Sequence, residues 1–268
     1  MGLTIHWKLK FDGSKVDALS LVKQMREKAM DMSFEEVSEV AHFAGQECDY
    51  ESMRGKDNPW FWALIQTQGN VTIKPDGTRL KKNERSTVGT CWISVKPIEA
   101  ILFTTWPGEG CEEANFGLCR YPKSIAHNGR MMATRFGTGW HWGSFCKTQY
   151  ANEKGVMNFL RCHTLVVAML DYAKELGILK EVSDEGDYWE KRDLKALAEE
   201  VGRWDVFIAG FSGMLENVVG KENLHSAIAE SPRYEHLKEL GMQHLDERGL
   251  GQLRELFDML KSKAEERK

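Results

Sequence analysis

The side chains best suited to chemistry gather in a central stretch, residues 106–163 of a chain of 268. The first segment of this stretch, residues 106–122, reads WPGEGCEEANFGLCRYP. Glycine allows backbone angles and close approaches that other residues do not, and function concentrates in loops that a rigid scaffold holds. The candidate ligand-binding side chains are one thiol, three carboxylates and a guanidinium: Cys111, Glu109, Glu112, Glu113 and Arg120. Two interpretations stay open, a ligand- or metal-binding loop and an Ω-type loop whose acidic groups face water.

The second segment of this stretch, residues 137–147, reads GTGWHWGSFCK. If it forms a strand, Trp140 and Trp142 lie on one face and His141 lies on the other. The two indoles suit either a stacking wall for a flat or sugar-like ligand or the packing of a core, and core packing is the favoured interpretation. The glycines match neither the P-loop pattern nor the dinucleotide-binding pattern.

The third segment is a helix expected over residues 156–176, which contains His163. At about 100° per residue, apolar side chains such as Phe159, Val166 and Val167 share its face, so His163 lies within the buried stripe. A buried imidazole requires a hydrogen-bonding partner. We favour a core histidine bonded to a backbone carbonyl or a tyrosine. The alternative is a ligand or proton carrier served by the glutamate-rich loop or by His141.

Zinc is the one cofactor that these residues suggest, with Cys111, His141 and His163 as candidate ligands. Structural zinc sites usually contain closely spaced ligand pairs, whereas Cys111 and Cys119 have seven residues between them. The sequence also contains no HExxH and no G-x-S-x-G pattern. The missing patterns favour a protein without a cofactor and without enzymatic activity.

Hydrophobic periodicity outside these segments predicts an α+β fold, mostly an antiparallel sheet packed by helices, with a helical C-terminal part. Strands are expected at 3–11, 60–66, 71–82 (a hairpin around Pro75-Asp76-Gly77), 88–96, 98–106, 131–136, 140–150 and 179–186. Helices are expected at 15–30, from Ser33 to near 45, at 156–176, 190–202, 204–219, 222–230, 233–241 and 247–266. A boundary near residue 220 divides an α+β domain, 1–220, from a helical extension, 221–268.

The overall composition is that of an ordinary globular protein, with 42% hydrophobic and 28% charged residues. A net charge of −4 argues against a protein that coats nucleic acid, and the basic arm at 74–85 is more typical of a solvated face. No apolar run reaches the length of a membrane span, and the N-terminus contains no secretory segment. The six cysteines form no C-x-x-C pair, so we expect reduced thiols in a cytoplasm.

The PGEGCEEANFGLCRYP loop, with GWHWGSFCKTQYA and DEGDYWEKRD, resembles segments of a family of bacterial cytoplasmic proteins that carries no assigned reaction. The opening MGLTIHWKLKF and the MSFEEV segment are similar to the same family, so the resemblance covers most of residues 1–215. It implies a prokaryotic source and transfers no catalytic residue.

The sequence favours a non-enzymatic bacterial protein that binds a partner protein or regulates a complex. As a setting we consider an accessory component of a prokaryotic defence system, including a CRISPR-linked one, although no residue argues for it. The alternative is an enzyme or a small-ligand or metal-binding protein that uses the 106–120 loop with His141 and His163. That alternative requires these groups to converge on one pocket.

Overall fold

The computed structural model describes residues 3–53, 58–81, 84–85, 88–219 and 227–247. Its main sheet contains β1 (Thr4–Phe11), β2 (Glu36–Val37), β3 (Ala41–Ala44), β6 (Glu99–Trp106), β7 (Ala114–Arg120), β10 (Trp140–Lys147) and β11 (Leu179–Asp184). Six of the seven strands follow the order β11-β1-β10-β7-β6-β2, and the seventh, β3, also pairs with β6. All of these pairings are antiparallel. The predicted α+β class with a mostly antiparallel sheet is therefore confirmed.

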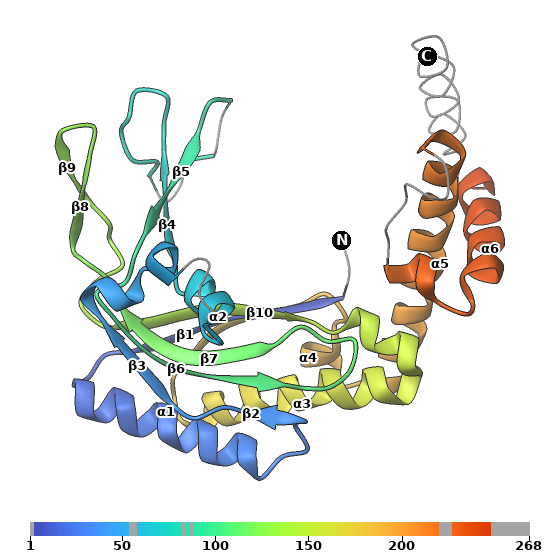
Figure 1. Ribbon diagram of the computed structural model, residues 1–268, viewed down its shortest axis with the longest axis horizontal. Helices are drawn as coiled ribbons and strands as arrows, with labels where there is room; N and C mark the ends of the chain where they lie inside the picture. Colours follow the sequence, from blue (N-terminus) through green and yellow to red (C-terminus); the bar gives the residue numbers. More distant parts are fainter. Residues whose placement is uncertain (1–2, 54–57, 82–83, 86–87, 220–226, 248–268) are drawn as a thin grey trace.

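Two long helices, α1 (Lys15–Met30) and α3 (Val156–Glu175), cover one face of this sheet (Figure 1). Helix α1 begins where Ser14 forms a capping box with Asp17, which satisfies backbone N–H groups that the helix leaves free. The strict alternation of β1 directs Ile5 and Trp7 into the core beneath the sheet, because successive side chains of a strand point to opposite faces. The other face is the open face, on which the short helix α2 (Phe61–Gln66) lies.

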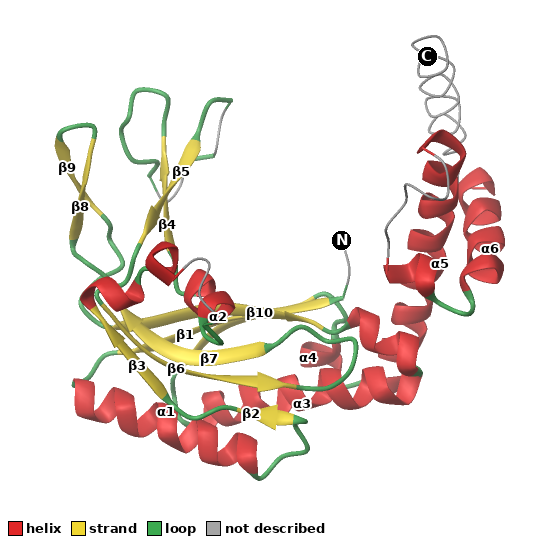
Figure 2. Ribbon diagram, viewed as in Figure 1, coloured by secondary structure: helices red, strands yellow, loops and turns green. Residues whose placement is uncertain are grey.

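Two hairpins rise from the open face, as Figure 2 shows. One consists of β4 (Gly69–Ile73) and β5 (Cys91–Val95), and the other of β8 (Ser124–His127) and β9 (Arg130–Ala133). They pack against each other through a small apolar cluster that includes Val71, Val95, Ile125 and Met132. The facing sides of the hairpins are thus apolar and buried, which leaves the far side of β4–β5 turned toward the sheet's open face.

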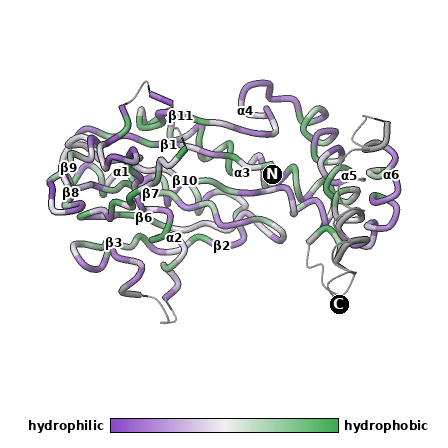
Figure 3. Tube along the Cα trace, turned by 90° about the horizontal axis from the view of Figure 1, so that it is seen from above, coloured by the Kyte–Doolittle hydropathy of each residue, from purple (hydrophilic) through white to green (hydrophobic). Residues whose placement is uncertain are grey.

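The C-terminal part of the described chain is helical, with α4 (Tyr188–Lys191), α5 (Leu194–Val219) and α6 (Tyr234–Glu247). Short 3-10 turns complete the fold: η1 (Gly45–Cys48), η2 (Tyr50–Met53), η3 (Gln149–Lys154) and η5 (Ala227–Glu230). Gly210 of α5 and Gly241 of α6 touch closely, so the two helices pack tightly there. Hydrophobic residues are frequent along α5, whereas α6 is largely hydrophilic (Figure 3). Within the described residues, no helix combines the length and apolar character needed to cross a bilayer.

Two predicted elements were wrong. The helix expected from Ser33 to near residue 45 is replaced by β2 and β3, which pair with β6. The unpaired edge of β6 supplies backbone partners, and this tertiary pairing overrides the local capping pattern. The strand expected at 60–66 is helix α2. A short apolar run is ambiguous between helix and strand, and only its surroundings decide.

Two further predictions were partly wrong. The turn at residues 74–78 forms, with Lys74 N–H donating to the Thr78 carbonyl at 2.7 Å, but the main partner of β4 is β5 rather than the residues that follow the turn. The helices expected at 190–202 and 204–219 form the single helix α5. The predicted boundary at 220 and the helix at 247–266 fall almost entirely outside the described residues.

Candidate functional site

His163 lies at the centre of a buried polar cluster beneath the sheet. Its ring is 0% exposed. Thr148 Oγ1 lies 2.9 Å from Nδ1, and Asp184 Oδ2 lies 3.2 Å from Nε2. Because an ionised carboxylate can only accept, Nε2 carries a hydrogen and donates it to Asp184, while Nδ1 and the Thr148 hydroxyl share the second hydrogen bond. His163 is thus a hydrogen-bonded core histidine, as favoured from the sequence. Its partners are a threonine and an aspartate, so the expected backbone carbonyl or tyrosine was wrong.

Asp184 completes this cluster by accepting two backbone hydrogen bonds. The N–H groups of Gly186 and Trp189 each donate to its carboxylate at 2.8 Å. Burial alone would raise the pKa of Asp184, but the bond from His163 and these backbone donors outweigh it and hold the pKa below its ordinary value. A hydroxyl, an imidazole and a carboxylate follow one another as in a hydrolase triad, yet the Thr148 hydroxyl is buried with its residue at 0% exposure. The cluster joins β10, α3 and β11.

His141 lies far from this cluster. It pairs with Lys10 near the start of β10, whereas Thr148 follows the end of that strand. Seven residues at about 3.3 Å each place the two positions about 23 Å apart along the chain. Burial and then the nearby Lys10 charge lower the pKa of His141. The structure therefore does not bring His141 and His163 to one pocket.

The loop predicted over residues 106–122 was partly wrong, because Ala114–Arg120 form the buried strand β7 and only residues 107–113 connect it to β6. The carboxylates of this shorter loop point to separate neighbours. Glu109 forms an exposed ion pair with Lys154 at 3.3 Å. Glu112 Oε2 accepts the N–H of Lys147 at 3.3 Å, which attaches the loop to the end of β10. Burial, followed by the charge of Glu36, raises the pKa of Glu113. These groups do not converge, and the described residues contain no group of three His, Cys, Asp or Glu placed to hold a metal.

The remaining predicted site residues belong to the core or its rim. Trp140 and Trp142 are 1% and 2% exposed. The Trp142 Nε1–H donates to the Asn115 carbonyl at 2.9 Å, and the Arg120 guanidinium lies 5.2 Å from the Trp140 ring. Arg120 also pairs with the buried carboxylate of Glu99 at 2.9 Å. The two indoles thus pack inside the sheet rather than forming a stacking wall.

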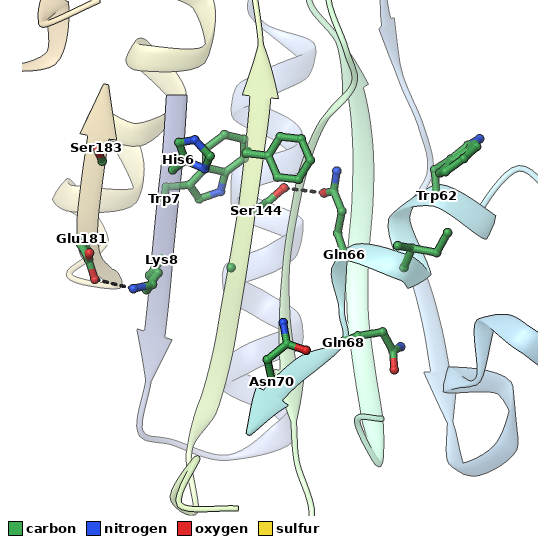
Figure 4. Close-up of a pocket in the computed structure, with 13 residues that line it drawn as sticks. His6, Trp7, Lys8, Trp62, Gln66, Gln68, Asn70, Ser144, Glu181 and Ser183 are labelled. Carbon is green, nitrogen blue, oxygen red and sulfur yellow. Dashed lines mark hydrogen bonds and ion pairs between the residues drawn. The ribbon is translucent and has the colours of Figure 1, made fainter. Parts of the chain in front are cut away.

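The clearest cavity lies elsewhere, on the open face of the sheet, and has a volume of about 610 Å³ (Figure 4). Its floor consists of residues from β1 and β10, namely His6, Trp7, Lys8, Gly143, Ser144 and Phe145. Its sides consist of Trp62, Ile65, Gln66, Gln68 and Asn70 around α2 and β4, and of Glu181 and Ser183 on β11. None of the residues proposed from the central stretch lines this cavity.

The β4–β5 hairpin extends one side of the cavity. Asn70 lines the cavity, and Thr72 follows two residues later on the same face of β4. Trp92 of β5 pairs directly with Thr72, and directly paired residues of antiparallel strands share a face. Trp92, 75% exposed, therefore lies on the cavity side of the hairpin. We define the cup as the cavity-lining residues together with Trp92.

Aromatic rings and neutral polar groups dominate the chemistry of the cup. Trp62 is 67% exposed and Phe145 is 40% exposed, so both rings offer apolar surface to a ligand. Gln66 Oε1 accepts bonds from Ser144 and Asn115, which leaves its NH₂ group as a donor. Trp7 Nε1 is buried and has no hydrogen-bond partner within the described part of the chain. The cup can thus stack on apolar groups and donate to oxygen atoms.

Lys8 and Glu181 form the charged rim of the cup and pair with each other at 2.8 Å. The two charges cancel, so this rim attracts neither anions nor cations strongly.

The sequence interpretation missed the cup. One signal was present, since the alternation in LTIHWKLKF places His6 and Lys8 on the face opposite the core residues. The exposure of Trp62 could not be predicted, because the sequence predicts a strand at 60–66 where the structure has helix α2. The chain matches no protein family model, no curated protein and no solved structure.

Proposed function

We propose that this chain binds a partner protein and that the cup receives a segment of that partner. The observation that carries the proposal is the position of Trp62 and Trp92, the two exposed tryptophans of the described residues, which both border the cup. Large aromatic side chains dominate the free energy of protein association when they become buried at the centre of an interface. An exposed aromatic surface supports a role in binding.

The polar groups of the cup suit the backbone of a peptide segment. The NH₂ group of Gln66 is a donor for a carbonyl oxygen. The Asn70 amide provides both a donor and an acceptor at the cavity wall. Because Lys8 and Glu181 neutralise each other, the expected partner segment is uncharged where it enters the cup.

The extent of the exposed surface favours a macromolecule over a small ligand. The cavity alone has the volume of a small-molecule site. Trp92, however, stands beyond the cavity on the hairpin, where a ligand that fills only the cavity would leave it exposed. A partner protein is large enough to cover the cavity and Trp92 together. A bacterial cytoplasm, a regulatory role and a place in a prokaryotic defence system stay predictions.

Site-specific photocrosslinking in the source organism tests this proposal. A photoreactive benzoyl-phenylalanine at position 62 should give a discrete crosslinked species with one protein, and the same substitution at Val16, 76% exposed on α1, should not. The crosslinked protein is then purified and its affinity measured. Trp62→Ala and Trp92→Ala should each raise Kd by about tenfold or more, as expected for interface hot spots.

Met157→Ala is the matched control, because Met157 is 74% exposed on α3, which covers the opposite face of the sheet. Its Kd should equal that of the wild type. Identical crosslinks from positions 62 and 16, or unchanged affinity in both tryptophan variants, would contradict the proposal.

A further inference from the structure

Strand β5 forms the free edge of its hairpin. It pairs with β4 along its length in a regular antiparallel register. The opposite edge of β4 is occupied, because the Leu80 N–H donates to the Thr72 carbonyl at 2.9 Å and Arg79 bridges to Ile73. Within the ranges that the structure describes, no strand pairs with the outer edge of β5. The hairpin thus ends on one side in an unpaired strand.

The hydrogen bond of Thr72 shows which backbone groups of β5 are free. The N–H and C=O of a strand residue point to the same side, so Thr72 directs both toward Leu80 and away from β5. Trp92 is paired directly with Thr72, so the two form a non-hydrogen-bonded pair and Trp92 directs its own N–H and C=O away from β4. Ser94 does the same, because it follows two residues later on the strand. Both residues are exposed, and their outward backbone groups have no hydrogen-bond partner among the described residues.

The sequence of β5 lacks the features that usually keep a strand edge from pairing. Natural edge strands are protected by charged side chains, by proline or by β-bulges. Strand β5 reads CWISV, with no charge and no proline, and its register with β4 contains no shift. The edge strand β11 of the main sheet differs, since it carries Lys180 and Glu181 and its register with β1 shifts. Of these two edges, β5 is therefore the one better suited to accept a further strand.

The free edge of β5 adjoins the cup. The ring of Trp92 belongs to the cup, and the Ser94 hydroxyl donates to Gln68 Oε1 at 3.3 Å. Gln68 lines the cavity and lies near Asn70 of β4, as Figure 4 shows. A partner segment that occupies the cup therefore lies next to the unpaired backbone groups of Trp92 and Ser94.

We propose that a segment of the partner protein pairs with the outer edge of β5 as an added strand. This inference rests on the proposed function and specifies the conformation of the segment that the cup receives. Alternate residues of an extended chain lie about 6.7 Å apart, so two partner residues at this spacing can exchange hydrogen bonds with Trp92 and Ser94. A helix has no free backbone groups along its length, because its own ladder uses them, so the segment is extended. We expect an apolar or β-branched side chain beside Trp92.

Ser94→Pro tests this pairing with the partner that crosslinks at position 62. The substitution removes the outward N–H of Ser94 and places ring carbons at the edge. The ladder to β4 keeps its hydrogen bonds, because the Ser94 N–H points away from β4, and proline is tolerated at such edge positions. We expect the Kd for the partner, measured by isothermal titration calorimetry, to rise by about tenfold or more.

Met131→Pro on β9 is the matched control. The Thr134 N–H donates to the Lys123 carbonyl at 2.9 Å, so the neighbouring pair Ser124–Ala133 is not hydrogen-bonded. The pair that contains Met131 lies two residues further along and is of the same type, so the Met131 N–H also points away from its partner strand. Met131 is 69% exposed, on the hairpin that packs against the side of β4–β5 opposite the cup. The Kd of this variant should equal that of the wild type.

Amide hydrogen exchange in the wild-type protein decides the question if Ser94→Pro does not fold. The amides of Trp92 and Ser94 should exchange rapidly in the free chain and about tenfold or more slowly in the complex, as followed by NMR. The amide of Ile93, which alternation turns toward β4, should exchange slowly in both states.

The outcomes separate this inference from the proposed function. An unchanged Kd for a folded Ser94→Pro, or two amides that exchange as fast in the complex as in the free chain, would overturn strand addition. The proposed function would still stand if Trp62→Ala weakened binding. Failure to capture any partner at position 62 would overturn both. Self-association of the purified chain that Ser94→Pro abolishes would assign the edge of β5 to a second copy and would also contradict the proposal.

Discussion

The two faces of the main sheet differ in how their polar and aromatic side chains are buried. Beneath the sheet, Thr148, His163 and Asp184 are buried and each is hydrogen-bonded within the cluster. On the open face, Trp62 and Trp92 expose most of their rings. Buried polar groups with complete partners stabilise a fold, whereas an exposed aromatic surface gains free energy only when something covers it. His163, which stood out in the sequence for its chemistry, therefore belongs to a cluster that stabilises the fold. The candidate binding site lies instead at the exposed tryptophans.

Of the substitutions that test this difference between the two faces, Asp184→Ala should lower the free energy of unfolding the most. The change leaves the Nε2–H of His163 and the backbone N–H groups of Gly186 and Trp189 buried without their acceptor. We expect the free energy of unfolding to fall by about 3–5 kcal/mol. Urea denaturation followed by circular dichroism measures this loss.

Glu181→Ala is the control on the same strand. Glu181 and its partner Lys8 have side chains that are 58% and 63% exposed, and such a solvated ion pair contributes at most about 1 kcal/mol. A similar loss of stability in both variants would mean that the two faces do not differ as described.

The second effect is the pH dependence of the Asp184 contribution. Because the folded-state pKa of Asp184 is lowered, its ionised form stabilises the fold above the unfolded pKa of about 3.9, and this stabilisation is lost as the pH falls through the folded pKa. The difference in unfolding free energy between the wild type and Asp184→Asn should therefore shrink between pH 6 and pH 3. A difference that stays constant over this range would show that the charge of Asp184 contributes nothing to stability.

The elements with a strong local pattern could be predicted from the sequence. Helix α3 follows its apolar periodicity, and β1 follows a strict alternation. The buried position of His163 follows from the same periodicity. Its partners could not be predicted, because Thr148, just after β10, and Asp184, in β11, are brought to His163 by strand pairings that the sequence does not reveal.

The cup could not be predicted because its residues come from six separate elements, β1, α2, β4, β5, β10 and β11. Short segments such as α2 and β2 carry too little periodicity to decide between helix and strand, so the pairing of β2 with β6 overrides the local signal. Cup residues such as Gln66 and Asn70 also belong to no catalytic motif. Only the fold brings them to one cavity.

The third effect concerns the hydroxyl of the buried cluster. Thr148→Val keeps the shape of the side chain but removes the hydroxyl that is hydrogen-bonded to His163 Nδ1. We expect the free energy of unfolding to fall by about 1–2 kcal/mol, the cost of leaving one buried polar group without a partner. Denaturation in urea measures it. Thr148→Ser retains the hydroxyl and should recover most of the loss, and no recovery would point to packing rather than hydrogen bonding.

The smallest effect on stability is expected for the tryptophans of the cup. Trp62→Ala and Trp92→Ala remove rings that are 67% and 75% exposed, so each should change the free energy of unfolding by no more than about 0.5 kcal/mol. The same denaturation experiment measures both. A loss above about 1 kcal/mol at either position would assign that ring to the packing of the fold, and the argument for a binding face would lose its main support. If both tryptophan variants keep the wild-type stability but bind the partner more weakly, the two faces differ in function. The buried cluster around His163 then stabilises the fold, and the exposed tryptophans bind the partner.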